Sequence, residues 1–458
     1  MEIGFESIGN ATLICYDKKP VLVTDPWLTG GAYFESWTLS HEIPEEQMKA
    51  ILSSEYVWLS HGHPDHLSSA SLKLLKGKRI LLPDHVGSRI YGAMKTQGYD
   101  VHRLKDREWV KLSDRIRILT IADYYQDAII LIDINGRLIV NTNDAGELGW
   151  GPFVRKTIKK YDISFLLSLS GFGDADMLNY FDENGERIMP VGAKRIPFGK
   201  TVALFAEGFG VKYFLPFSSM HQYRRSDSLW ANRCVTALSD YEVGFESKSC
   251  KILPAFIRYD CLKDQYQCLN PAMNPIKVLP PEEIGDSWDD PLEPGDFELV
   301  KNYFKAVSHL ERTLDFINVR VAGKDHRIEF NRHRFDRGIT FETPRKSLML
   351  AVTHQIFDDL LIGNFMKTTL HGTWRTKSIY PYFSPYVPKY ADNGRARTRE
   401  ELAAYFKEYR KRAFLDYFRH KIEEGSTNIL RPLFSRDSKA FHVGRIVYYK
   451  YKRLTSAL

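Results

Sequence analysis

Three histidines and an aspartate lie within six residues in the stretch His61-Gly62-His63-Pro64-Asp65-His66. Imidazole and carboxylate groups are ligands for zinc, iron and manganese. The stretch follows an apolar run, 56–59, and ligands so close in sequence can converge on a metal where a strand ends in a tight turn. His61 and His63 are expected to share one ion, while Asp65 and His66 bind a second ion beyond the proline bend. The alternative is a polar loop whose histidines bind nothing.

Two later strand ends offer further ligands. The predicted strand 138–143 leads into a turn at Asp144, and the apolar run 213–217 leads toward His221. Because a carboxylate has two oxygens that can bridge two cations, we expect Asp144 to be the bridging ligand and His221 to complete the second metal. Taken alone, Asp144 would be a turn or capping residue and His221 a satisfied polar contact. The early histidine cluster favours the metal-binding interpretation of both.

Short β-rich runs alternate with helical stretches in the first part of the chain, which indicates an α/β architecture of sheets covered by helices. Strands are expected at 12–16, 21–24, 79–82, 116–121, 129–134, 138–140 and 165–169, with helices at 69–75 and 88–97. The proline-rich segment 270–281 stops both helix and strand. We therefore predict two domains: 1–270 with the metal site, and 271–458, a mixed α/β accessory domain that binds substrate or a partner.

These residues resemble the signature of the metallo-β-lactamase superfamily, a His-x-His-x-Asp-His turn followed by a bridging Asp after a strand and a last His. The resemblance covers about residues 1–270. It implies an αββα sandwich with a binuclear metal site at the sheet edges. It also implies that Asp25, which follows the run 21–24, supports the metal ligands from outside without binding metal itself.

One position departs from the superfamily pattern. A metal-binding His usually lies between the first cluster and the bridging Asp, but no His occurs from Val110 to Gly146. Asp123 is the expected substitute and would join His61, His63 and Asp144 in the first site. This set is harder and more anionic than an imidazole-rich zinc site, so it favours iron. Alternatively, Asp123 only accepts backbone hydrogen bonds, and the first site is weak or empty.

Within the superfamily, the order of features is most similar to the metallo-β-lactamase-like portion of CMP-N-acetylneuraminate hydroxylases, which are oxygenases with a non-haem iron site. The similarity includes 140–144, 168–173 and 215–227. That family also carries a Rieske cluster held by two Cys and two His. No Cys of this chain is followed by a His two or three positions later. The resemblance therefore implies an oxygenase that needs an external reductase or ferredoxin.

Two mechanisms compete for the same ligands, with Asp65 and Asp144 as the expected catalytic residues. A diiron monooxygenase would use dioxygen as co-substrate to hydroxylate a small molecule, and carboxylate-rich ligation favours it. A hydrolase with zinc or manganese would lower the pKa of a bridging water, and Asp65 would orient the resulting hydroxide toward an ester, lactone, amide or phosphodiester. A third alternative is a single metal with a structural role.

Composition narrows the class of protein. The 458 residues are 43% hydrophobic and 26% charged, which is typical of globular proteins. A formal net charge of +7 favours an anionic substrate or partner only weakly and argues against a general nucleic-acid binder. Neither a long apolar run nor an export signal is found, so we expect no membrane span and a cytoplasmic protein.

The second half gives weaker signals. The run 348–365 is predicted as one buried helix, and 316–330 as two strands around Gly323. Thr398–Glu401 has capping-box spacing and begins a helix predicted to continue through Glu424. The basic face of that helix is either a solvated surface or a site for an anionic partner.

Overall fold

The computed structural model describes residues 1–430 together with Val443 and Gly444, except for Leu148, Ser170, 172–178, 195–196, Ser219 and Arg375. One of the segments of predicted similarity, 168–173, therefore lies partly outside the described residues.

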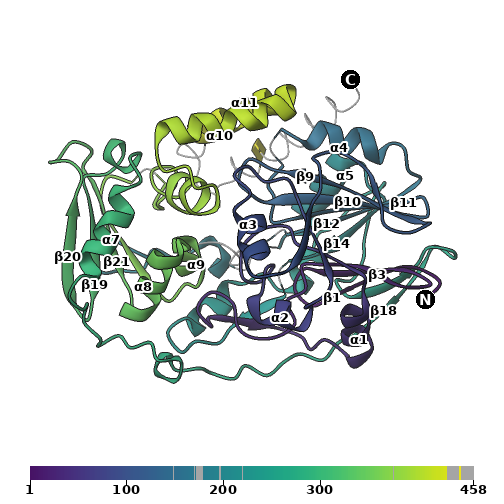
Figure 1. The fold of residues 1–458 in the computed structure, drawn as a ribbon, viewed down its shortest axis with the longest axis horizontal. Helices are drawn as coiled ribbons and strands as arrows, with labels where there is room; N and C mark the ends of the chain where they lie inside the picture. Colours follow the sequence, from purple (N-terminus) through teal and green to yellow (C-terminus); the bar gives the residue numbers. More distant parts are fainter. Residues whose placement is uncertain are drawn as a thin grey trace.

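Two stacked β-sheets form the centre of the first part of the chain (Figure 1). Within the described residues, the eight-stranded sheet has the order β18 (Gln265–Cys268), β17 (Ile257–Asp260), β1 (Ile3–Ile8), β2 (Thr12–Asp17), β3 (Lys19–Thr24), β5 (Tyr56–Trp58), β6 (Arg79–Leu82) and β7 (Asp100–Arg103). The seven-stranded sheet has the order β16 (Lys251–Ile252), β14 (Tyr213–Pro216), β12 (Ile163–Ser168), β11 (Arg137–Asn143), β10 (Ala128–Ile134), β9 (Ile116–Ala122) and β8 (Val110–Lys111).

Apolar side chains of both sheets pack against one another between the layers. Phe5 on β1, for example, meets Phe165 on β12 edge to face, with ring centroids 5.1 Å apart. Strands buried on both faces have nearly continuous apolar sequences, and β10 accordingly has every residue buried. The outer face of the first sheet is covered by α1 (Glu45–Ser53), α2 (Ser69–Leu74) and α3 (Arg89–Thr96), and that of the second by α4 (Gly151–Ile158) and α5 (Gly199–Phe209). The predicted αββα sandwich is confirmed.

A third sheet lies beside the sandwich and has five strands within the described residues. Its order is β13 (Tyr180–Phe181), β22 (Lys367–Gly372), β21 (Arg337–Glu342), β19 (Phe316–Val321) and β20 (Lys324–Glu329). Because β13 comes from the first 270 residues and pairs with β22, both parts of the chain build this sheet. The domain boundary near residue 270 stays a prediction.

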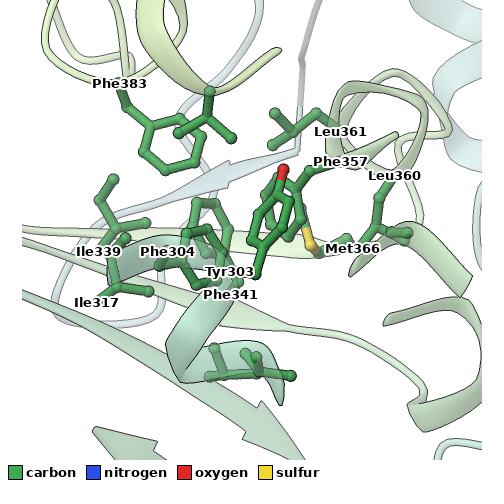
Figure 2. Packing of buried hydrophobic residues seen from close by; sticks show 14 of the residues in the cluster. Tyr303, Phe304, Ile317, Ile339, Phe341, Phe357, Leu360, Leu361, Met366 and Phe383 are labelled. Atoms are coloured by element: carbon green, nitrogen blue, oxygen red, sulfur yellow. The ribbon is translucent and has the colours of Figure 1, made fainter. Parts of the chain in front are cut away.

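The third sheet is covered by α7 (Asp296–Lys305), α8 (Arg345–His354) and α9 (Phe357–Ile362). An aromatic cluster fixes these elements to one another (Figure 2). The ring of Phe357, at the start of α9, lies 5.2 Å from the Phe304 ring on α7 and 5.0 Å from the Phe341 ring on β21. Figure 1 shows α9 on the side of this domain that faces the sandwich.

Two predicted helices are divided in the structure. The stretch 348–365 contains α8 and α9 rather than one helix, because Gln355 adopts a left-handed conformation with φ of 58° and turns the chain. The predicted helix through Glu424 is divided at Ala413 into α10 (Arg399–Arg412) and α11 (Phe414–Leu430). The capping box of Thr398 and Glu401 is confirmed. None of the helices in the described part of the chain has the length and apolarity of a membrane span.

We predict that Phe341→Ala lowers the free energy of unfolding by about 3–5 kcal/mol, because it removes a fully buried ring from this cluster. Guanidinium unfolding measures the change. Val278→Ala is the matched control, since Val278 is 53% exposed and its loss should change the free energy by no more than about 0.5 kcal/mol. Equal effects of the two variants would contradict the assignment of this cluster as the core of the second domain.

Candidate metal centre

The histidine-rich turn lies between two elements that hold it at both ends. Strand β5 ends at Trp58, and α2 begins after Ser68, whose hydroxyl accepts a hydrogen bond from the Ser71 N–H. Between them, the N–H groups of His66 and Leu67 both donate to the His63 carbonyl, at 3.0 and 2.7 Å. This tight turn brings the three imidazoles of His61, His63 and His66 together at the edge of the sheet.

Each of these imidazoles uses one ring nitrogen for an outer partner. The Nδ1 of His61 lies 2.9 Å from Ser60 Oγ, and the Nδ1 of His66 lies 3.1 Å from Asp25 Oδ2. For His63 the outer nitrogen is Nε2, which lies 3.0 Å from Asp358 Oδ2. The remaining nitrogens are inward: His61 Nε2 and His63 Nδ1 lie 2.9 Å apart. A metal-binding imidazole commonly has this arrangement, with the second nitrogen fixed by a carboxylate or other acceptor.

Asp25 lies where the sequence prediction requires a supporting residue. It is fully buried, and its carboxylate accepts hydrogen bonds from the Ser60 N–H and the Ser60 hydroxyl, both at 2.7 Å, besides its contact with His66. Burial raises the pKa of Asp25 although His66 opposes the shift. The supporting role stays a prediction, and these contacts are what such a role needs.

Asp65 and Asp144 converge on the inner nitrogen of His66. Their Oδ2 atoms lie 3.4 and 3.5 Å from His66 Nε2. Asp144 Oδ2 is also 3.9 Å from His61 Nε2, so this carboxylate lies between the two groups of histidines. Asp65 is oriented by the Tyr33 hydroxyl at 2.6 Å and by the Asn10 amide at 2.9 Å. These distances agree with a bridging Asp144 and leave its metal-binding role a prediction.

His221 is placed by a short two-stranded ribbon. It opens β15 (His221–Tyr223), which pairs with β4 (Trp37–Leu39). The imidazole stacks on the Trp37 indole, with centroids 3.4 Å apart and planes 5° apart. Burial lowers the pKa of His221 to about 3, so the ring is neutral, the form that binds metals.

Unpaired polar atoms test whether these residues fit a metal. The buried atoms without a hydrogen-bond partner include His66 Nε2, Asp144 Oδ1 and both ring nitrogens of His221. A buried polar atom left without a partner costs roughly 1–3 kcal/mol. Among the described residues, one oxygen or nitrogen from each of His61, His63 and Asp144 lies within 4.8 Å of the others. The residues therefore fit metal ions held among these atoms.

Asp123 and Asp127 share one turn but face different ways. Asp123 Oδ1 accepts hydrogen bonds from the N–H groups of Tyr125 and Asp127, at 2.7 and 3.1 Å. Asp127 Oδ1 instead lies 4.0 Å from His61 Nε2. Burial and the neighbouring Asp127 raise the pKa of Asp123 to about 8. The geometry favours Asp127 as the carboxylate nearest the first site, and metal binding by Asp123 stays a prediction.

In addition to Asp127, the sequence analysis missed two carboxylates near His63. Asp358 and Asp359, on α9 beside the third sheet, reach His63, and one oxygen of each lies within 4.8 Å of a His63 nitrogen. The hydrogen bond and the charge of Asp358 raise the pKa of His63 to about 9 against the lowering effect of burial. Two adjacent acids at buried positions of a helix were the only signal in the sequence.

Comparison with known proteins gives partial matches. No family model matches the chain. Cytidine monophosphate-N-acetylneuraminic acid hydroxylase of Asterias rubens is 29% identical over 156 residues, which are 31% of this chain and 24% of that protein. The chain thus spans about a quarter of the length of the curated relatives it matches. The predicted resemblance to this hydroxylase family is confirmed over that segment.

Solved structures align over about half of the chain. A mutant of CmlA beta-hydroxylase covers 48% of this chain and 46% of its own, with 15% identity and a TM-score of 0.34. The isothiocyanate hydrolase from Delia radicum gut bacteria covers 55% of this chain and 96% of its own, with 17% identity and a TM-score of 0.37.

We predict that Asp127→Asn weakens metal binding at least about ten-fold, because it removes a negative charge that faces His61. Asp123→Asn is the matched variant from the same turn. Its amide oxygen can still accept the two backbone hydrogen bonds, so metal affinity should change less. Competition titration against a chelator measures both. A larger loss in Asp123→Asn than in Asp127→Asn would identify Asp123 as the ligand.

Proposed function

We propose that this chain is a binuclear metal-dependent enzyme. One ion would be held by His61, His63 and Asp127, and the other by Asp65, His66 and His221, with Asp144 between them. The single observation that carries the proposal is a set of buried atoms without hydrogen-bond partners, His66 Nε2, Asp144 Oδ1 and both ring nitrogens of His221. Asp144 links them, because its Oδ2 lies 3.5 Å from His66 Nε2 and its charge acts on His221. Ordinary structural histidines and aspartates would pair these atoms with the protein.

We further propose an oxygenase rather than a hydrolase. The ligand set contains three carboxylates beside four imidazoles. Carboxylate oxygens suit iron or manganese, whereas zinc sites are commonly richer in imidazole. The partial similarity to a hydroxylase family supports the same choice. An iron pair, when bound, would supply redox chemistry with dioxygen. Hydroxylation of one C–H or N–H bond consumes O2, two electrons and two protons and yields water, so an external reductase or ferredoxin is needed.

The side chains of this protein would shape the site in two ways. His61, His63, His66 and His221 are each at most 8% exposed, so the interior is shielded from bulk water. Lys389 is half-buried, and its charge acts on His61, Asp127 and Asp144. Its Nζ lies 5.1 Å from the centroid of the Tyr125 ring, so Lys389 adds a positive charge beside the buried carboxylates of the site.

A metal-dependent hydrolase is the second candidate, and the orientation of Asp65 favours it. Tyr33 and Asn10 hold both oxygens of this carboxylate in one position beside His66. A carboxylate so fixed can orient an attacking water molecule. Zinc or manganese, when bound, would supply the lowered pKa of that water.

Metal analysis with dioxygen uptake separates the two candidates. We expect about two iron ions per chain after anaerobic purification and dioxygen consumption that depends on an added reductant. Tightly bound zinc alone, with turnover of an ester or a phosphodiester and no dioxygen uptake, would reject the oxygenase and favour the hydrolase.

We predict that Asp144→Asn lowers the metal content from two ions to one or fewer and abolishes turnover, because an amide lacks the charge to bridge two cations. Elemental analysis of the purified variant measures the content. Asp133→Asn is a matched control, since Asp133 lies on β10 and pairs with Arg117 far from these ligands. Unchanged metal content and activity in Asp144→Asn would exclude a catalytic binuclear centre.

A further inference from the structure

Helix α9 is fixed to the sandwich at both ends. Before it, Arg89 on α3 donates to the carbonyls of His354 and Gln355, at 2.9 and 3.2 Å. After it, the Ser36 hydroxyl donates to the Gly363 carbonyl at 2.6 Å, and the Asn364 amide donates to the Tyr223 hydroxyl at 2.8 Å. The partners of both anchors belong to the first part of the chain, so the position of α9 is set by contacts between the two parts.

The second domain fixes the same helix from its other side. The Phe357 ring packs in the aromatic cluster of Figure 2, and the Phe357 N–H donates to Asp392 at 3.0 Å. Asp392 also accepts a hydrogen bond from the Tyr303 hydroxyl. With Phe357 held inside the domain, the next residue, Asp358, reaches His63 of the sandwich, 295 positions earlier in the sequence.

We propose that Asp358 is a positioning residue of the metal centre, supplied by the second domain. Its carboxylate accepts the Nε2–H of His63, so a metal ion would displace the proton on Nδ1, the nitrogen that lies 2.9 Å from His61 Nε2. The ring is therefore fixed both in its orientation and in the nitrogen that it offers to a metal. This role rests on the proposed function in one respect, because it requires that the centre binds metal. It holds for an oxygenase and for a hydrolase alike.

The arrangement matches the outer contacts of the neighbouring histidines. Asp25 serves His66 and Ser60 serves His61 from within the sandwich, whereas the acceptor for His63 comes from another domain. Asp358 is 3% exposed, so its charge faces the imidazole without screening by solvent. A charge-assisted hydrogen bond in such a place is stronger than a neutral one and makes the ligand more basic.

An alternative role of the same residues is to bind a separate metal ion. The possible ligand atoms of His63, Asp358 and Asp359 also lie within 4.8 Å of one another. That arrangement would place metal on Nε2 and break the hydrogen bond to Asp358. It predicts one more ion per chain than the binuclear centre, and loss of that ion alone when Asp358 is replaced.

The test is metal affinity, measured with Zn²⁺ or Co²⁺ in competition with a chelator on metal-stripped full-length protein. We expect Asp358→Ala to weaken binding of one ion by about 10–100-fold and to change the Co²⁺ absorption spectrum. Asp358→Asn should give an intermediate loss, because its amide oxygen still accepts the ring N–H but carries no charge. The thermal midpoint of each metal-free variant reports the effect on folding.

Asp296→Asn is the control for general damage to the second domain. Asp296 is buried on α7 and accepts hydrogen bonds from Arg345 and from the Glu293 N–H, remote from His63. It should lower the thermal midpoint without changing metal affinity. Equal affinity and identical Co²⁺ spectra in wild type and Asp358→Ala would overturn the proposal, as would a third bound ion lost on that substitution. Absence of metal binding by the wild type would instead reject the proposed function itself.

Discussion

The structure depends on burying a group of imidazoles and carboxylates at one edge of a β-sandwich, where each polar atom needs a partner in place of water. An imidazole has two nitrogens on opposite sides of the ring, so each histidine needs both an outer and an inner partner. The outer partners, Ser60, Asp25 and Asp358, are protein groups. The inner atoms of His66, Asp144 and His221 have none. The rings of His61, His63 and His66 are thus divided into a protein side and an inner side, which is what metal binding at this place would need.

The sandwich can bring these residues together because its strands end at a common edge. Residues following β5, β11 and β14 leave the sheets near one another, and the turn between β1 and β2 joins them through Asn10. The amide of Asn10 donates to Asp65, its side-chain oxygen accepts the Met220 N–H, and its carbonyl accepts the Ser218 N–H. A single turn thus couples the histidine-rich loop to the loop that presents His221.

The second domain does more than cover the sandwich. Strand β13 of the first part completes its sheet, while α9 returns Asp358 to His63. Contacts therefore run in both directions across the proposed boundary. Metal binding at this place would be sensitive to how the two parts pack, since a shift of α9 would change the hydrogen bond of His63. The contact between Asp358 and His63 therefore both orients an imidazole of the site and joins the two parts of the chain.

The sequence by itself determined the fold class and singled out the histidine-rich turn, whose metal binding stays a prediction. The spacing of His61, His63, Asp65 and His66 requires a strand-end turn. Apolar runs such as 129–134 identify buried strands, because a short apolar run is visible in the sequence of the strand itself. The sequence indicated Asp123 as the ligand from the turn 123–127, whereas the carboxylate that lies 4.0 Å from His61 Nε2 is that of Asp127. Both residues are aspartates, so only the path of the chain distinguishes them. The sequence also predicted two continuous helices that the structure divides, because the left-handed Gln355 and the break at Ala413 have no distinctive residue type. Only the tertiary structure decided that Asp358 meets His63, because a contact between residues 295 positions apart is set by the packing of α9 against the sandwich and leaves no local pattern.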